Sequence, residues 1–91
     1  MDLNEKIGER IGERIRRARQ RLGWNQSELA RQLGKPRQHL SLLEQGKQIP
    51  TARLLIDLAE TLEVSTDYLL GRGKAEDEEE AHPALVGVGQ G

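Results

Sequence analysis

The stretch from residue 25 to residue 47, NQSELARQLGKPRQHLSLLEQGK, constrains the fold of this 91-residue chain more than any other segment. Asn25 is a helix-capping residue, and Glu28 three positions later completes the pattern of a capping box, so a helix is predicted to begin here. Gly34 ends that helix, because glycine adopts the left-handed conformation at low cost, and Pro36 suits the first turn of a second helix. The segment therefore predicts two short helices joined by a tight turn.

The second of these helices has a narrow apolar stripe. Only Leu40 and Leu43 share a spacing that buries both side chains against the rest of a domain. The side chains left on or near its surface are those of Arg37, Gln38, His39, Ser41, Leu42 and Gln45. Arginine can donate two hydrogen bonds to guanine O6 and N7, and glutamine can pair with adenine N6 and N7. This surface suits base reading in the major groove of DNA, although a polar helix face taken alone is more often only a solvated surface.

The run from about Ile11 to Gly71, about two thirds of the chain, resembles the Xre/Cro family of phage-repressor-type helix-turn-helix proteins. The residues that carry the resemblance are Gln26, Glu28, Leu29, Ala30, Leu33, Gly34, Arg37, Leu40, Ser41, Leu43, Glu44, Gly46, Lys47, Pro50, Leu58, Ala59, Leu62, Val64 and the closing run Asp67-Tyr68-Leu69-Leu70-Gly71. Two positions depart from the family pattern. Pro36 stands where a serine or threonine cap is common, and Leu42 stands where a polar residue is usual. Leu42 can contact a thymine methyl or a partner protein instead.

The resemblance implies an all-α, five-helix fold like that of lambda repressor, with the helix-turn-helix formed by the second and third helices. The implied base-reading residues are Arg37, Gln38, Ser41 and Leu42. The implied phosphate-contacting residues are Asn25, Gln26, His39, Gln45 and Lys47. Base contacts set the preferred sequence, and phosphate contacts set the register on the duplex. The implied function is transcriptional regulation by a repressor that binds a near-palindromic operator as a homodimer.

Two other functions are compatible with the same fold. An antitoxin of a toxin-antitoxin pair would also bind DNA, and would hold a toxin through its C-terminal segment or Leu42. A protein-interaction module would keep the fold and bind no DNA. A neighbouring toxin gene would favour the first alternative, and a lack of DNA binding at any salt concentration would favour the second.

Two further pairs of residues have roles in the resembling family. Arg19 and Glu44 correspond to a charge pair that ties the first helix to the end of the third. Independently of the family, each of them flanks the apolar stripe of its helix, which places both where the helices meet. Tyr68 and Leu70 lie at an end of the domain that often forms a dimer contact, and the alternative is that they close the core of the monomer.

The remaining helices are predicted from apolar periodicity and caps. Apolar residues recur at spacings of four or three in a first helix, at Ile7, Ile11, Ile15, Ala18 and Leu22. Gly8 and Gly12 each cost about 1 kcal/mol relative to alanine in a helix, so this helix is expected to be firm only from about residue 11. Thr51 is the expected cap of a fourth helix, and a short fifth helix is expected between Ser65 and Gly71.

Charge is divided unevenly along the chain. Residues 1–74 hold 14 Lys and Arg against 10 Asp and Glu, whereas residues 75–91 hold five acidic residues and no Lys or Arg. The first part is therefore basic, as a surface that contacts phosphates requires, although the net charge of the whole chain is −1. We predict that residues 1–72 form one helix-turn-helix domain and that residues 73–91 form a disordered acidic tail.

The sequence gives little support to an enzyme, a metal site or a cofactor. It contains no cysteine, and its two histidines, His39 and His82, have no carboxylate or cysteine at ligand spacing. There is no glycine motif of the kind that cradles phosphates. No apolar run of about 18 residues and no export signal is present, so no membrane partner is expected. We expect a cytoplasmic, nucleoid-associated protein of bacterial or phage origin, with double-stranded operator DNA as its partner.

Overall fold

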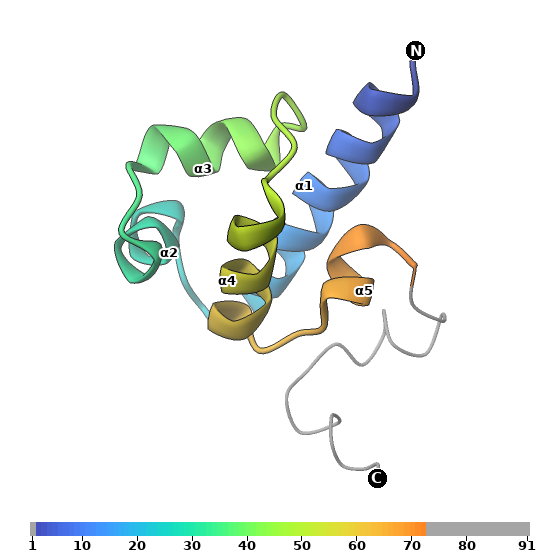
Figure 1. The fold of residues 1–91 in the computed structure, drawn as a ribbon. Coiled ribbons are helices and arrows are strands. Elements are labelled where there is room, and N and C mark those ends of the chain that lie inside the picture. Colours follow the sequence, from blue (N-terminus) through green and yellow to red (C-terminus); the bar gives the residue numbers. More distant parts are fainter. Residues whose placement is uncertain (1, 73–91) are drawn as a thin grey trace, which may run out of the picture.

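The computed structural model describes residues 2–72, which form five α-helices and no strand. In chain order the helices are α1 (Leu3–Arg21), α2 (Gln26–Leu33), α3 (Arg37–Glu44), α4 (Ala52–Leu62) and α5 (Thr66–Leu70). In Figure 1, α2 and α3 lie on one side of the long α1, and α5 lies on the other. This arrangement confirms the predicted all-α, five-helix fold, with α2 and α3 as the helix-turn-helix.

Side-chain caps set the start of four helices. Asp2, Asn25, Thr51 and Ser65 each accept a hydrogen bond from the backbone N–H three residues later, at 2.8, 2.8, 3.1 and 2.9 Å. The start of α3 differs, because Pro36 occupies its N-cap and makes no side-chain hydrogen bond there. The sequence predicts Pro36 in the first turn of this helix. In the structure Pro36 lies one position before the first residue of α3. It orders the chain through its fixed φ of −67°.

A single apolar core lies between the helices and draws on all five of them. Its buried members are Ile11, Ile15, Ala18, Leu29, Ala30, Leu40, Leu43, Leu54, Leu58, Ala59, Leu62, Tyr68 and Leu69. The eight-residue α3 contributes only Leu40 and Leu43 to this core. So short a helix is unstable in isolation, and its stability comes from packing. The orientation of α3 is therefore decided by the helices around it.

None of the described helices is long and apolar enough to cross a membrane.

Two glycines let α1 pass close to the end of α3. A Cβ atom at Gly8 would lie 2.6 Å from the carbonyl oxygen of Gly46, and one at Gly12 would lie closer still to the carbonyl oxygen of Leu43. Only a residue without a side chain fits against this backbone. The helix begins at Leu3, so it also covers the residues before 11 that were expected to be less firm. The two glycines are buried packing positions.

Tyr68 lies in this core, with only 2% of its surface exposed. The guanidinium carbon of Arg14 lies 5.9 Å from the centroid of the Tyr68 ring, within the range of a cation–π contact. Leu70 is partly buried and packs against the core from its edge. Tyr68 therefore helps to close the core of the monomer, which is the alternative that the sequence left open. Leu70 retains a partly exposed surface.

We expect Gly12→Ala to destabilise the fold, although alanine is the better helix former by about 1 kcal/mol. The added methyl group would force α1 away from the backbone of α3, so the free energy of unfolding should fall by about 1–3 kcal/mol. Urea denaturation followed by circular dichroism measures this change. Arg16→Ala, at an exposed position of the same helix, is the control and should change stability by less than about 0.5 kcal/mol. A more stable Gly12→Ala variant would contradict the close packing.

The end of α4 lies at a non-glycine residue in the left-handed conformation. Glu63 has φ 64° and ψ 41°, and the N–H of the next residue, Val64, donates to the carbonyl of Ala59 at 3.0 Å. This conformation costs a residue with a side chain roughly 1–2 kcal/mol. Glu63→Gly is therefore expected to raise the free energy of unfolding by about 0.5–1 kcal/mol. In the same denaturation assay Glu60→Gly, inside the helix, should lower it by about 1 kcal/mol.

Candidate nucleic-acid interface

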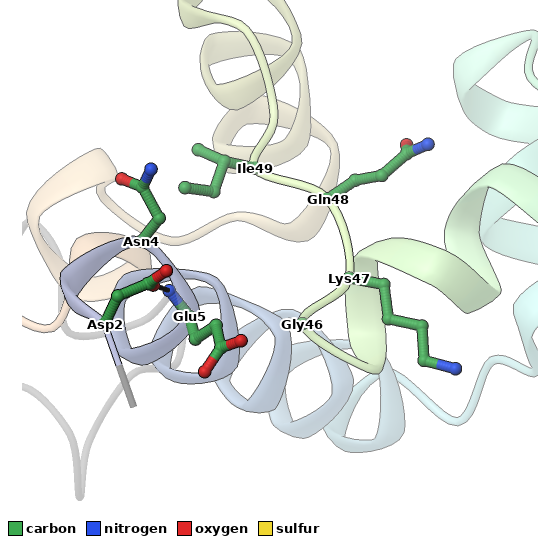
Figure 2. A pocket seen from close by; sticks show the side chains of 7 residues that line it. All are labelled: Asp2, Asn4, Glu5, Gly46, Lys47, Gln48 and Ile49. Atoms are coloured by element: carbon green, nitrogen blue, oxygen red, sulfur yellow. Dashed lines mark hydrogen bonds between the residues drawn. The ribbon is translucent and has the colours of Figure 1, made fainter.

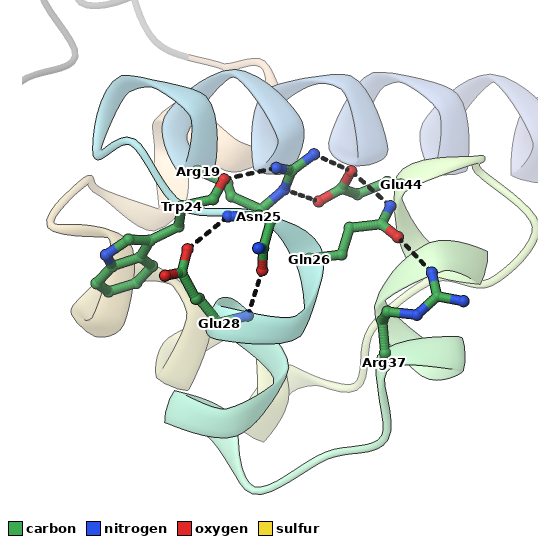
Figure 3. Close-up of polar contacts among 7 residues, drawn as sticks. All are labelled: Arg19, Trp24, Asn25, Gln26, Glu28, Arg37 and Glu44. Atoms are coloured by element: carbon green, nitrogen blue, oxygen red, sulfur yellow. Dashed lines mark hydrogen bonds and ion pairs between the residues drawn. The ribbon is translucent and has the colours of Figure 1, made fainter.

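A buried ion pair joins α1 to the end of α3. Arg19 donates from Nε to Oε2 of Glu44 at 2.7 Å and from Nη2 to Oε1 at 2.9 Å, so the two groups meet at two points (Figure 3). The side chains are only 10% and 4% exposed. The Nη1 atom of Arg19 donates to the carbonyl oxygen of Trp24 at 2.7 Å. One guanidinium thus holds together α1, the α1–α2 turn and α3.

The hydrogen bond with Glu44 raises the pKa of Arg19, and the Coulombic attraction of the same carboxylate adds to this, against the lowering effect of burial. A basic group whose pKa is higher in the folded than in the unfolded protein contributes fully to stability below its unfolded-state pKa. This contribution is lost as the pH rises through the folded-state pKa. For arginine both values are strongly alkaline, so Arg19 stays charged and adds no pH dependence to stability near neutrality.

Gln26 extends this pair towards the surface. Its Nε2 donates to Oε1 of Glu44 at 3.0 Å, and its Oε1 accepts from Nη1 of Arg37 at 3.1 Å (Figure 3). A continuous chain of polar contacts therefore runs from Arg19 to the first residue of α3. The sequence had indicated separate roles for Gln26 and Arg37, a phosphate contact and a base contact. No local signal revealed that they touch, because the contact depends on how α2 packs against α3.

The predicted base-reading residues follow α3 from its first turn. Arg37 and Gln38 are exposed, whereas Ser41 and Leu42, about one turn later, are partly buried. Ser41 accepts a hydrogen bond through its hydroxyl oxygen from Nε2 of Gln45 at 2.7 Å. The start of α3 therefore offers the most accessible donors, and its middle offers a smaller, partly apolar surface.

The predicted phosphate-contacting residues lie at the start of α2, within α3 and just after α3. Asn25, Gln45 and Lys47 are exposed, and Gln26 and His39 are partly buried. The side-chain oxygen of Asn25 accepts from the N–H of Glu28 at 2.8 Å, and Glu28 accepts in return from the N–H of Asn25 at 2.8 Å. Because the cap uses the Asn25 oxygen, its side-chain NH₂ is the group suited to a phosphate.

A shallow hollow of about 240 Å³ lies between the start of α1 and the loop after α3 (Figure 2). Its lining residues are Asp2, Asn4, Glu5, Gly46, Lys47, Gln48 and Ile49. Two carboxylates make the hollow unfavourable for an anion. The side chain of Lys47 points away from Asp2 and Glu5, as Figure 2 shows. Lys47 is therefore directed towards the side of α3, where a phosphate contact was predicted.

The α2–α3 segment, residues 25–47, holds two acidic residues, and both are engaged within the protein. Glu28 belongs to the capping box of α2, and Glu44 pairs with Arg19. The exposed cations of the same segment are Arg31, Lys35, Arg37 and Lys47. The segment therefore presents mainly positive charge, as a phosphate-contacting surface needs. Among residues 2–72, no cluster of His, Cys, Asp and Glu is suited to hold a metal ion.

Residues 15–69 match the helix-turn-helix family, and this range includes α2, α3 and both members of the buried ion pair. The chain belongs to the Xre/Cro-type helix-turn-helix family. This family match lies within the range of about 11–71 over which the sequence shows the resemblance. The acidic tail expected over residues 73–91 lies outside the described residues.

Two curated relatives come from Bacillus subtilis (strain 168). The HTH-type transcriptional regulator ImmR is 36% identical over 70 residues, which are 77% of this chain and 55% of ImmR. The SPbeta prophage-derived uncharacterized HTH-type transcriptional regulator YonR is 41% identical over 60 residues, which are 66% of this chain and 56% of YonR. The chain thus spans just over half the length of these relatives. No solved structure matches it.

Breaking the buried pair should cost far more stability than breaking an exposed one. Glu44→Ala strands the charge of Arg19, so we expect the free energy of unfolding to fall by about 3–5 kcal/mol. The control is Glu13→Ala, which removes the exposed pair with Arg17 at 2.8 Å and should cost about 1 kcal/mol or less. Urea denaturation compares the two variants.

A double replacement tests whether the cost comes from the stranded charge. Arg19→Met with Glu44→Leu leaves no unpaired ion, so the pair of changes should destabilise less than the sum of the two single changes. Equal, small losses for the buried and the exposed pair would show that α3 is held by Leu40 and Leu43 alone.

Proposed function

We propose that this protein is a DNA-binding transcriptional regulator that reads bases with α3. One observation carries the proposal. α3 exposes Arg37 and Gln38 at its start while Leu40 and Leu43 anchor its other side in the core. An anchored helix with exposed arginine and glutamine has the donors and acceptors that discriminate base pairs in the major groove. Membership of the helix-turn-helix family and the names of both relatives support the same function.

The proposed reading places the start of α3 deepest in the groove. Arg37 would donate to guanine and Gln38 would pair with adenine, while Ser41 and Leu42 would contact bases about one turn further on. Phosphate contacts would come from residues around the reading surface, namely Asn25, Gln26, His39, Gln45 and Lys47. The basic α2–α3 segment would supply affinity through counterion release, so binding should weaken steeply with added salt.

The proposed active form is a homodimer acting as a repressor at a near-palindromic operator. A single short helix contacts few base pairs, and proteins of this motif gain site size by placing two reading helices about one DNA turn apart. The repressor role rests on the resemblance to phage-type repressors. Leu70 is the residue of the expected dimer contact that keeps a partly exposed side chain.

Selection of binding sites from a random DNA pool tests the proposal directly. The expected result is one defined motif with two-fold symmetry and half-sites about one helical turn apart. A motif without symmetry would remove the homodimer. No binding to any DNA, even at low salt, would contradict the proposed function and favour a protein-interaction module.

Variants separate base reading from phosphate contact at the selected site. Arg37→Ala should weaken cognate binding by about 1–3 kcal/mol and relax the preference at one base pair. Lys47→Ala should weaken cognate and random DNA alike and reduce the salt dependence, because it removes only a phosphate contact. Titrations on both DNAs at several salt concentrations measure these effects. Equal losses on cognate and random DNA for Arg37→Ala would remove it from the base-reading set.

A further inference from the structure

We propose that a basic stripe on α1 is the docking surface of the acidic run of the same chain, residues 76–80. The basic stripe consists of Lys6, Arg10, Arg14, Arg17 and Arg21. The acidic run has the sequence EDEEE, five consecutive acidic residues. This docking goes beyond the proposed function, because it needs no DNA and uses a side of α1 that does not meet α3.

The basic stripe lies on the side of α1 that packs against α5. Its members recur at spacings of three or four residues, so they share one face of the helix. Arg14 lies over the ring of Tyr68 in α5, and the side chain of Arg10 occupies the space that a Cβ atom at Gly71 would need. Arg19, which reaches α3, lies on a different face. Since α5 and α3 lie on opposite sides of α1 in Figure 1, DNA held by α3 would not cover the stripe.

Five cations on one helix face favour a negatively charged partner, because like charges three or four residues apart destabilise a helix. The acidic residues of α1 relieve little of this repulsion. Glu13 pairs with Arg17 at 2.8 Å, whereas Glu5 and Glu9 lie beside the loop after α3. Every cation of the stripe except Arg14 is exposed, so a run of carboxylates can approach it from solvent.

The acidic run is tethered beside the stripe and matches it in length. The last described residue, Arg72, follows Gly71, which lies against Arg10. Glu76 comes four residues later, so the run begins within roughly 14 Å of this point. Five extended residues span roughly 17 Å, and the stripe from Arg10 to Arg21 is about 16 Å long. A short tether gives an effective concentration of about millimolar, which favours docking within one chain.

The α2–α3 segment is a second basic surface, with exposed Arg31, Lys35, Arg37 and Lys47. It lies across α1 from α5, so the acidic run would have to pass around the domain to reach it (Figure 1). The two dockings have different consequences. A run held on the basic stripe leaves α3 open to DNA, whereas a run held on the α2–α3 segment competes with DNA for one surface.

Paramagnetic labelling of the full chain measures where the acidic run lies. The chain contains no cysteine, so Ala81→Cys provides a single site for a nitroxide label directly after the run. At low salt we expect loss of amide NMR signal along the basic stripe, around Arg14 and Arg17, and the least loss at Arg37 and Gln38. At 1 M salt, where the screening length is about 3 Å, the lost signals should return.

A charge-neutral run is the main control, because it leaves residues 2–72 unaltered. In the labelled chain its five substitutions are Glu76→Gln, Asp77→Asn, Glu78→Gln, Glu79→Gln and Glu80→Gln. The signals of the basic stripe should then return even at low salt, since the attraction between the run and the stripe is removed.

Matched variants of the two basic surfaces locate the attraction on the domain. Arg10→Gln with Arg17→Gln removes two charges from the basic stripe and should return part of the lost signal. Arg31→Gln with Lys35→Gln removes two charges from the α2–α3 segment and should leave the loss unchanged. Circular dichroism checks that each variant keeps its helices.

Three results would overturn the inference. Signal loss centred on the α2–α3 segment would make the acidic run a competitor of DNA. Loss spread evenly over the domain and insensitive to salt would show that the run prefers no surface. The third result comes from isotope-enriched protein without the label, mixed with labelled protein of natural isotope content. Loss as strong there as in the single labelled chain would place the run on a second copy. None of these outcomes bears on DNA reading by α3, so the proposed function is tested separately.

Discussion

The carboxylate of Glu44 is buried where α1, α2 and α3 meet, and a buried charge persists only when it is paired and hydrogen-bonded. Arg19 and Gln26 meet that requirement from two different helices. The pair need not add much net stability, since desolvation offsets attraction. Its consequence is geometric, because α3 cannot slide or rotate without leaving a charge unsatisfied. The same network reaches the exposed Arg37 at the start of α3, which donates a hydrogen bond to Gln26.

The ion pair forms only because α1 and α3 approach closely. Gly8 and Gly12 lie on the face of α1 that meets the end of α3, and Arg19 follows Gly12 by two helical turns on the same face. Any side chain at the two glycines would separate the helices and lengthen the reach to Glu44. Gly8 and Gly12 therefore lower the intrinsic helix propensity of α1 but allow it to pack closely against the end of α3. The same geometry places the reading surface of α3 outward, since its only core residues lie on the opposite side.

Much of the fold could be predicted from the sequence because helix ends are local features. A cap such as Asn25 bonds to a backbone group three residues away, and Gly34 acts through its own φ, so both can be recognised without the tertiary structure. Apolar periodicity likewise indicated which leucines are buried. The exposed chemistry of Arg37 followed from the same periodicity. Glu63 is an exception. It ends α4 in the left-handed conformation, and no glycine at that position indicates this in the sequence.

By itself, the sequence determined the number and order of the helices, most of their ends, and the residue types available on α3. The tertiary structure decided what depends on segments far apart in the chain. It placed Tyr68 in the core, where the sequence had left two roles open, and it made Gly12 a packing position where a weak point was expected. It also brought Gln26 against Arg37. The physical reason is that propensities and caps act within one helical turn, whereas burial and side-chain pairing are set by the angle and distance at which helices cross.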